Sequence, residues 1–515
     1  MLDLNGDQIF PPITQKQETQ QFESALESYA VGFSNPDPEN PQDWPKLKRW
    51  RVLCVALFVT YTSAFNATAN GAASAGFRKE HPGVTKAVFT SSSFTYLVML
   101  GIGPLALAPI SETFGRRPML VILTGVICIL FLPQALAPNV ASIIATRFFQ
   151  GLAACIEGPV AAGVVADLFP KNIRGPAMGT FVLTVFTANS TGPLCAAWIA
   201  QKLGWHWVYW IQMMSGGLCW ALCLFFLPET RGDVILTKRA KAISKQTGKE
   251  HFVFGLDVHD SFAHAIKISL SRPLLYLFTE PIVTALSLWV GFAWGAVFLL
   301  VGTISNVFQV TYGFSQGQAG TVLICGFIGA SIGWFENYYI QERFYRNAIK
   351  KGNGLAAPEV RLYSSAVGGI LFAVGCFCFG WTARPWIHWI VPCIFIVILN
   401  AGIYTIYLAT YNYLGDVYNR YSSSAQASQS LLRNILGAVF PFFALPMYNK
   451  LTFPWASTVV GFIALSFSVV PWILIFFGAR LRARSKIAVD LANLEGTIIP
   501  DEPSAISVTQ EKTHV

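Results

Sequence analysis

Twelve apolar segments, each close to twenty residues long, constrain the fold of this chain more than any other feature. A helix of about 20 apolar residues crosses a bilayer, and all its backbone polar groups are hydrogen-bonded internally. The composition agrees, because 53% of the 515 residues are hydrophobic and only 12% are charged. We therefore expect an all-α integral membrane protein with twelve transmembrane helices. The segments lie at about 52–72, 88–109, 119–138, 142–166, 176–200, 207–228, 281–306, 317–339, 362–383, 387–415, 424–447 and 455–478.

Basic residues indicate the orientation of these helices. The short loop at 108–118 lies between the second and third segments and carries Arg116 and Arg117. Lysine and arginine collect in cytoplasmic loops, and the loops on this side hold many more of them than those on the other side. Both termini are therefore predicted to be cytoplasmic.

The longest internal polar segment divides the twelve helices six and six. This division predicts two six-helix halves with a substrate site between them, near the middle of the bilayer. The expected organisation is a disordered cytoplasmic N-terminus, a first half, a cytoplasmic central loop, a second half and a cytoplasmic tail, at residues 1–45, 46–228, 229–279, 280–480 and 481–515.

Charge and cysteine patterns argue against several other classes of protein. The net charge of +9 is spread over short loops without a contiguous basic face, so nucleic-acid binding is not expected. The ten cysteines all lie in apolar segments, without the spacing of metal ligands. No phosphate-binding glycine loop is present either. The sequence therefore predicts no cofactor, no metal site and no enzymatic activity.

Several motifs resemble those of the major facilitator superfamily. Residues 112–117 resemble its signature between the second and third helices, with Ala108 and Glu112 replacing the usual glycine and aspartate. Residues 147–151 resemble the arginine motif of its fourth helix. Further motifs resemble the fungal twelve-span drug:proton antiporters, which include polyamine, caffeine and azole exporters; these motifs are Asp37–Pro41 with Trp44, Ala166–Pro170, Leu227–Thr230 and Met447–Leu451.

The resemblance implies alternating-access export of a small organic molecule, such as a drug, a secondary metabolite or a polyamine. The energy source would be the proton gradient. Gly192 and Pro193 resemble the antiporter motif of the fifth helix, although Ala196 and Ala197 replace its second pair of glycines. This departure leaves an importer or uniporter of a small organic nutrient as the alternative.

The signature loop implies a cytoplasmic gate that stabilises the outward-facing state. Its arginines can hold carboxylates, or the carbonyl groups at helix C-termini, across the interface between the halves. Arg433 lies deep in the eleventh helix, and we expect it to pair with Glu112 or another acid rather than with substrate. A purely topological role is the alternative for the loop. The residues assigned to the gate are Glu112, Gly115, Arg116, Arg117, Asp167, Arg174 and Arg433.

Polar residues within the fourth helix are candidates for coupling proton and substrate movement, because ionisable groups at membrane depth are costly. Glu157 lies roughly 15 Å from Asp167 at 1.5 Å per residue, near the bilayer midplane. A glutamate in a dry cavity could exchange its proton for a cationic substrate. A glutamate neutralised for structural reasons is the alternative. Gln150 shares a helix face with Glu157, and Arg147 is the third candidate.

Polar aromatic side chains along two helix faces predict a cargo cavity. Asn400, Tyr404, Tyr407 and Tyr411 follow i, i+4, i+7, i+11 spacing in the tenth helix, and Trp294 lies in the seventh. Tyrosine hydroxyls inside a span need hydrogen-bond partners, which favours a wet cavity over lipid. Such rings could stack on aromatic substrates or hold amines by cation–π attraction. Ordinary helix packing is the alternative.

These observations together predict a proton-coupled efflux transporter. Its expected partners are a small-molecule substrate, protons and the lipid bilayer, and it is expected to work as a monomer. The plasma membrane is the expected location, with the vacuolar membrane as the alternative. A receptor or scaffold is disfavoured because neither terminus supplies a large signalling domain.

Overall fold

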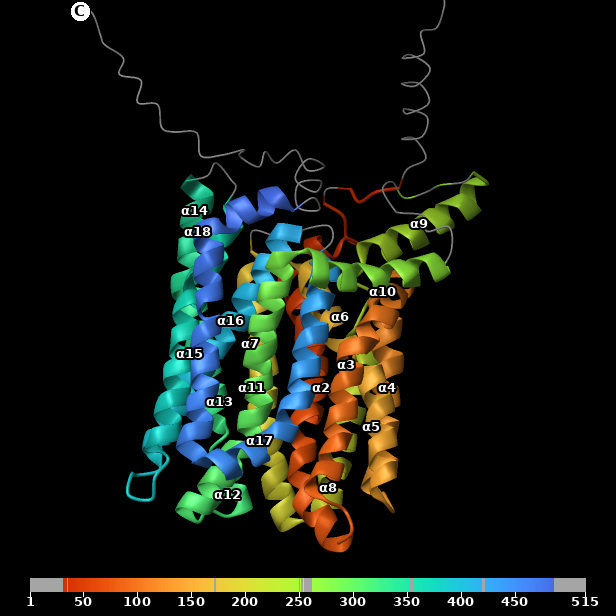
Figure 1. The fold of residues 1–515 in the computed structure, drawn as a ribbon. Helices are drawn as coiled ribbons and strands as arrows, with labels where there is room; N and C mark the ends of the chain where they lie inside the picture. Colours follow the sequence, from red (N-terminus) through yellow and green to blue (C-terminus); the bar gives the residue numbers. More distant parts are fainter. Residues whose placement is uncertain are drawn as a thin grey trace, which may run out of the picture.

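The computed structural model describes residues 31–34, 36–170, 173–249, 251, 253, 262–351, 356–418 and 422–485, without the side chains of residues 108, 109, 112, 113, 262–269 and 445. These residues form a bundle of long helices, and no strand occurs among them (Figure 1). The predicted all-α membrane fold is confirmed. Much of the N-terminal segment, which was expected to be disordered and cytoplasmic, lies outside the described residues, and so does much of the tail, which was expected to be cytoplasmic.

The first half of the chain and the central loop supply the helices at one side of the bundle. A short 3-10 helix, η1 (Pro41–Asp43), precedes them. The long helices are α2 (Lys46–Glu80), α3 (Lys86–Phe114), α4 (Arg116–Ala135), α5 (Val140–Ala154), α6 (Glu157–Leu168), α7 (Arg174–Lys202) and α8 (Trp205–Phe226), followed by α9 (Gly232–Thr247) and α10 (Phe262–Thr279) of the loop.

The second half repeats this plan with more interruptions. Its elements are α11 (Pro281–Tyr312), α12 (Gln316–Thr321), α13 (Ile324–Glu336), the π-helix η2 (Asn337–Gln341), α14 (Glu342–Lys351), the 3-10 helix η3 (Pro358–Leu362), α15 (Tyr363–Thr382), α16 (Ile390–Tyr418), α17 (Ser422–Phe467) and α18 (Val469–Arg484). Figure 1 shows α9, α10 and α14 at one end of the bundle and α12 at the other. We call these the α9 end and the α12 end.

Eleven helices in the described part of the chain are long and apolar enough to cross a membrane. The other predicted span, 424–447, forms the first part of α17, whose opening turns are rich in serine and glutamine. The helix is interrupted at Thr452, where φ is 64°, so α17 joins the eleventh predicted span to the start of the twelfth. Most of each predicted segment is therefore helical in the structure.

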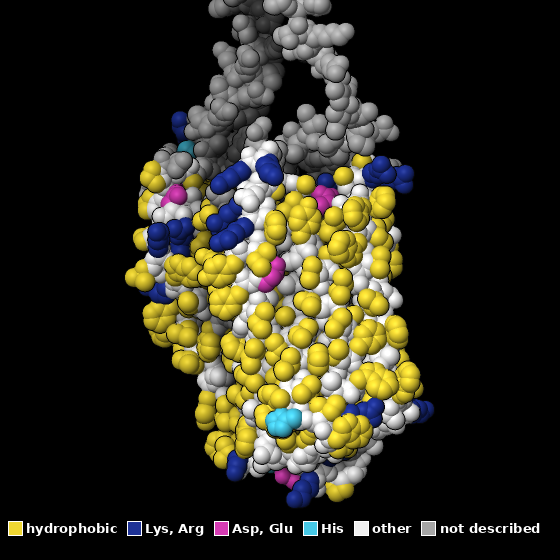
Figure 2. Space-filling model, turned by 90° about the vertical axis from the view of Figure 1, so that its left-hand side faces the viewer, with side chains coloured by type: hydrophobic (Ala, Val, Ile, Leu, Met, Phe, Trp, Pro, Cys, Tyr) yellow, Lys and Arg dark blue, Asp and Glu magenta, His cyan; other side chains and the backbone are white. Residues whose placement is uncertain are grey.

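The outer surface matches a bilayer. On the face shown in Figure 2, hydrophobic side chains cover the middle of the molecule, whereas lysine and arginine side chains gather near its upper end. Exposed large apolar residues such as Phe225, Phe278 and Phe476 would be unfavourable in water but not in lipid.

Two helices of the first half, α3 and α7, pack closely against helices of the second half. α7 of the first half packs along α12 and α13 of the second, and α3 packs along α17. The approach is close: a Cβ atom on Gly101 of α3 would lie 3.1 Å from the Cβ of Asn434 of α17. The interface between the halves is thus lined by α3 and α7 on one side and by α12, α13, α16 and α17 on the other.

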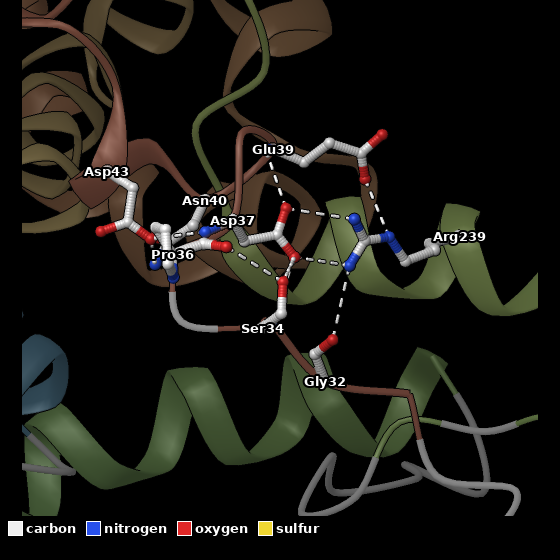
Figure 3. Close-up of polar contacts among 8 residues, drawn as sticks. All are labelled: Gly32, Ser34, Pro36, Asp37, Glu39, Asn40, Asp43 and Arg239. Carbon is white, nitrogen blue, oxygen red and sulfur yellow. Dashed lines mark hydrogen bonds and ion pairs between the residues drawn. The ribbon is translucent and has the colours of Figure 1, made fainter.

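The N-terminal segment before α2 is bound to the central loop (Figure 3). Asp37 receives two hydrogen bonds from the Arg239 guanidinium of α9, at 2.7 and 3.1 Å. Val31 packs in a small apolar cluster with Leu236 and Ala240 of α9. Val31 and Asp37, which fall in the segment expected to be disordered, therefore have defined partners in α9.

Candidate functional site

The turn between α3 and α4, at the α9 end, is held by Glu229 from the segment after α8. Gly115 has φ of 101°, which glycine adopts without the strain of a side chain. The Glu229 carboxylate accepts hydrogen bonds from the backbone N–H groups of Arg116 (2.9 Å) and Arg117 (3.1 Å). A carboxylate at a helix N-terminus pairs N–H groups that lack partners within the helix. Glu229 therefore fixes the direction in which α4 leaves the loop.

The side chains of this loop bind groups of their own half. Arg116 Nε lies 3.4 Å from the carboxylate of Asp167 at the end of α6. Arg117 donates to the backbone oxygen of Leu224 in α8 (3.2 Å). These contacts differ from the expected bridge across the interface, because the short loop turns both arginines toward the ends of α6 and α8. The side chain of Glu112 lies outside the described residues.

The contact between the halves at this end is made one residue after Arg174. Arg174 itself donates to the backbone oxygens of Phe169 (3.2 Å) and Ala166 (3.1 Å), at the C-terminal end of α6. Gly175 faces the second half, since a Cβ atom there would lie 2.6 Å from a carboxylate oxygen of Glu342. The start of α7 thus touches the start of α14.

Glu342 belongs to a buried ion network in the second half. Its carboxylate lies 3.5 Å from Arg361 Nη1, and Arg361 Nε lies 3.1 Å from the carboxylate of Asp416. The Arg361 guanidinium also lies over the ring of Tyr345, 3.3 Å from its centroid. The network stands in the second half where the Arg116–Asp167 pair stands in the first.

Two of the predicted coupling residues lie in a polar cluster inside the first half. Arg147 is fully buried and donates to the side-chain oxygen and the backbone oxygen of Asn66, and its guanidinium lies 4.2 Å from the ring centroid of Tyr96. Gln150 accepts a hydrogen bond from Gln134 (2.8 Å). In the described residues no carboxylate pairs with Arg147.

Glu157 lies at a break in the fourth predicted span. The helix is interrupted at Cys155 and Ile156, so Glu157 opens α6 rather than continuing α5. Its side chain is only 1% exposed, and it accepts a hydrogen bond from the Thr124 hydroxyl of α4 at 3.2 Å. Among the described residues, no lysine, arginine or histidine forms an ion pair with it.

An aromatic cluster fills the centre of the interface between the halves. The rings of Trp294 and Tyr407 are stacked, with centroids 5.3 Å apart. Phe186 of α7 packs edge-on against Trp294 (5.7 Å), Tyr404 (5.7 Å) and Tyr407 (6.3 Å). The Tyr404 hydroxyl donates across the interface to the backbone oxygen of Gly179 (2.9 Å). We call Phe186, Trp294, Tyr404 and Tyr407 the aromatic cluster.

Arg433 joins this cluster instead of the Arg116–Asp167 contacts. It donates from Nη1 to the Tyr407 hydroxyl (2.7 Å) and from Nη2 to the Ser430 hydroxyl (3.3 Å). Its guanidinium carbon lies 4.9 Å from the ring centroid of Trp294. No acidic partner of Arg433 is found among the described residues, and the side chain of Glu112, one of the expected partners, lies outside them.

A cavity opens next to the aromatic cluster, on its α12 side. Of the residues predicted to line a cavity, only Asn400 lines this one. Trp294, Tyr404 and Tyr407 are buried and pack against Phe186. Tyr411 packs against Phe181, with ring centroids 6.2 Å apart. The lining comes from both halves: Phe186, Asn189, Ser190, Val297, Leu300, Val301, Ile304, Leu323, Gly326, Ile396, Leu399 and Asn400.

The Gly192–Pro193 motif lies where α7 crosses α2 within the first half. A Cβ atom on Gly192 would lie 2.6 Å from the Thr68 hydroxyl and 3.0 Å from the backbone oxygen of Phe65. Pro193 lies inside α7 and removes one backbone donor. The motif therefore lets the two helices approach closely, as expected of small residues in membrane bundles.

The halves also touch at the α12 end. Trp198 Nε1 donates to the Thr321 hydroxyl (2.9 Å), and the backbone N–H of Gly317 donates to the Gln201 side chain (2.6 Å). A Cβ atom on Gly317 would lie 2.5 Å from the Trp198 ring. Both ends of α7 are thus in contact with the second half.

Sequence reasoning missed several of these partners. Phe186 gave no signal, because a phenylalanine in an apolar helix is unremarkable without its neighbours. Glu229 did give one, as an acid in the motif Leu227–Thr230, but nothing in the sequence linked it to the start of α4. No group of three His, Cys, Asp or Glu side chains suited to a metal ion occurs among the described residues.

The chain is similar to known membrane transporters over most of its length. The family model described as Major Facilitator Superfamily matches residues 53–441. An MFS-type efflux pump of Trichophyton rubrum is 33% identical, with 89% of this chain and 77% of the pump covered. A major facilitator superfamily multidrug transporter of Candida albicans is 32% identical, with 93% and 79% covered.

Solved structures show the same fold at low sequence identity. The proton:xylose symporter XylE has a TM-score of 0.60 at 14% identity, with 84% of this chain and 97% of the symporter covered. The human organic anion transporter MFSD10 has a TM-score of 0.58 at 17% identity, with 83% and 100% covered. With two helical halves that together line a cavity and a matching family model, the chain belongs to the major facilitator superfamily and is a multi-pass membrane transporter of small molecules.

Proposed function

We propose that the chain exports a small organic molecule in exchange for protons. In this proposal Glu157 binds the proton, and the cargo occupies the cavity that Asn400 and Phe186 line. Homologous proteins with more than 30% identity include fungal efflux pumps and a multidrug transporter, which supports export over import.

The burial of Glu157 is the observation that carries the proposal. An ionised carboxylate without a counter-ion is strongly unfavourable in a low-dielectric interior. With 1% exposure and a hydroxyl of Thr124 as its neighbour, Glu157 is best accommodated as the neutral acid. A group of this kind can take up a proton when the bundle faces one side of the membrane and release it when water enters from the other.

The contacts at the two ends of α7 supply the gates. Export requires the Gly175–Glu342 contact to open while cargo enters, and the Trp198–Thr321 contact to open while cargo leaves. The Arg116–Asp167 pair and its counterpart around Arg361 keep each half rigid at the α9 end as the halves rock. Proton binding at Glu157, within the first half, would bias this equilibrium without touching the cargo.

The orientation and setting belong to the same proposal. The excess of basic residues in the loops of the α9 end supports a cytoplasmic location for that end and for both termini. We place the chain in the plasma membrane. We also propose that it works as a monomer, since both halves of one chain line the cavity.

The test compares cells that produce the natural chain with cells that produce E157Q. Mass spectrometry of the cells and of the medium identifies the small molecules that the natural chain moves outward, and a protonophore is expected to abolish that movement. E157Q keeps the shape of the side chain but cannot release a proton, so export is expected to fall at least about tenfold at equal amounts of protein in the membrane.

The matched control is E80Q, which changes an exposed glutamate at the end of α2 in the same way. Its export is expected to equal that of the natural chain. Export by E157Q at the natural rate would show that Glu157 does not couple transport to protons. Accumulation of compounds inside the cells that produce the chain would identify an importer.

A further inference from the structure

The guanidinium of Arg433 lies beside the interface of the halves without a carboxylate partner among the described residues. Arg116 pairs with Asp167, and Arg361 pairs with Glu342 and Asp416. Arg433 has no ion pair among the described residues, and its Nε atom is buried without a hydrogen-bond partner. The unpartnered Nε–H gives this arginine spare hydrogen-bonding capacity. An anionic partner would also be favourable, because an unpaired charge in a membrane interior is costly.

Arg147 shows how such a charge is otherwise accommodated. It is also without a carboxylate, but it is completely enclosed in the first half, where Asn66 accepts three of its hydrogen bonds. Arg433 instead remains partly exposed and rests on two hydroxyl groups, those of Tyr407 and Ser430. Hydroxyls are weaker acceptors for a guanidinium than a carboxylate is.

The position of Arg433 relates it to the cargo. Its partner Tyr407 and its ring neighbour Trp294 both touch Phe186, which lines the cavity. Phe186, followed by the Trp294 and Tyr407 rings, therefore lies between the cavity and the guanidinium. The next residue, Asn434, donates to the backbone oxygen of Leu100 in α3 (3.4 Å), so this stretch of α17 borders the surface along which the halves move.

The occupied cation–π position decides the sign of the charge that fits. The Trp294 and Tyr407 rings could hold a cationic cargo, but the Arg433 guanidinium already lies over both, at 4.9 and 5.1 Å from their centroids. A second cation would be repelled there. A carboxylate would find an unused Nε–H, and flat apolar groups would find aromatic rings to stack on.

We propose that Arg433 binds the anionic group of the cargo, so that the transported class is amphipathic organic carboxylates with an aromatic or aliphatic body. The inference rests on the proposed transport function and adds the substrate class to it. When the halves separate at the α9 end, Phe186 moves with α7 away from Trp294 and Tyr407. The carboxylate then reaches Arg433, and the body of the molecule lies between Trp294 and Phe186.

Equilibrium dialysis of the purified full chain in lipid nanodiscs tests this with three probes of one shape: 2-naphthoate, neutral 2-naphthamide and cationic 2-naphthylmethylammonium. The natural chain is expected to bind naphthoate at least about tenfold more tightly than either other probe. R433Q is expected to lose that preference while its weak affinity for naphthamide stays the same, because a charge-assisted pair is replaced by a neutral one.

The matched control is R480Q, which removes an exposed guanidinium near the end of α18 and is expected to keep the preference for naphthoate. If R433Q does not give monodisperse protein, R433K is tested in its place. Lysine keeps the charge but lacks the planar guanidinium, so naphthoate binding is expected to weaken about three- to tenfold. Equal affinity of the natural chain for naphthoate and naphthamide, no binding of naphthoate, or unchanged naphthoate binding in the variant tested overturns the proposal. Binding is measured without a proton gradient, so a failure of proton coupling at Glu157 leaves this result independent.

Discussion

Replacing Gly175 by alanine is expected to separate the two halves at the α9 end. The added Cβ would lie 2.6 Å from a Glu342 carboxylate oxygen, well inside van der Waals contact. Glu342 cannot retreat freely, because its side chain is 4% exposed and lies 3.5 Å from Arg361. Overpacking of this kind costs about 1–3 kcal/mol. This free-energy cost applies only when the halves touch at the α9 end. The ratio of molecules open at that end to molecules closed there therefore rises about 5- to 150-fold.

Hydrogen–deuterium exchange of the purified chain measures this shift. Backbone amides of residues 174–185 and 337–351 are expected to exchange faster in G175A. The control is G302A, where the added Cβ has nothing within 4 Å and exchange should stay the same. The double variant G175A/E342A removes the colliding carboxylate and should restore slow exchange. Equal exchange in G175A and the natural chain would refute the view that this contact closes the α9 end.

Three further predictions concern contacts at the ends of the bundle. G317A should speed amide exchange at the α12 end instead, because its Cβ would lie 2.5 Å from the Trp198 ring. E229Q replaces one of the two accepting oxygens at the start of α4 by an NH2 group. It should lower the free energy of unfolding of the purified chain by about 0.5–2 kcal/mol, the range for losing a helix cap, as measured by thermal unfolding in detergent. D37N should speed proteolysis between residues 31 and 45 at neutral pH. The hydrogen-bonded Arg239 holds the pKa of the Asp37 carboxyl well below its usual range. In the natural chain, resistance of residues 31–45 to proteolysis should therefore persist above about pH 4 and decrease as the pH falls below it.

The fold was predictable because the bilayer restricts the possible structures so strongly. Apolar segments of spanning length must be helical, and the polar segment at 229–279 separates two sets of six. The pattern could not show that the fourth span breaks at Cys155 or that η2 interrupts the eighth, because these irregularities arise from packing between helices.

The site was predictable at the level of single residues but not of their partners. Glu157 was identifiable as a buried acid, and Tyr407 as part of a polar helix face. The pairing of Arg433 with Tyr407 was not, because it depends on how deeply α17 and α16 pack against each other. For the same reason Phe186, which lines the cavity, could not be distinguished from the other apolar residues of α7.

The two end contacts of α7 have a consequence for inhibition. At one end of α7 Gly175 contacts Glu342, and at the other end Trp198 contacts Gly317. Each end of α7 therefore has one close contact with the second half. A small molecule bound between the two residues of either contact would keep that end open and hold the transporter in one orientation. Blocking such a protein would therefore not require a compound that competes with the cargo, and a compound bound at the α12 end would not need to enter the cell if that end faces outward.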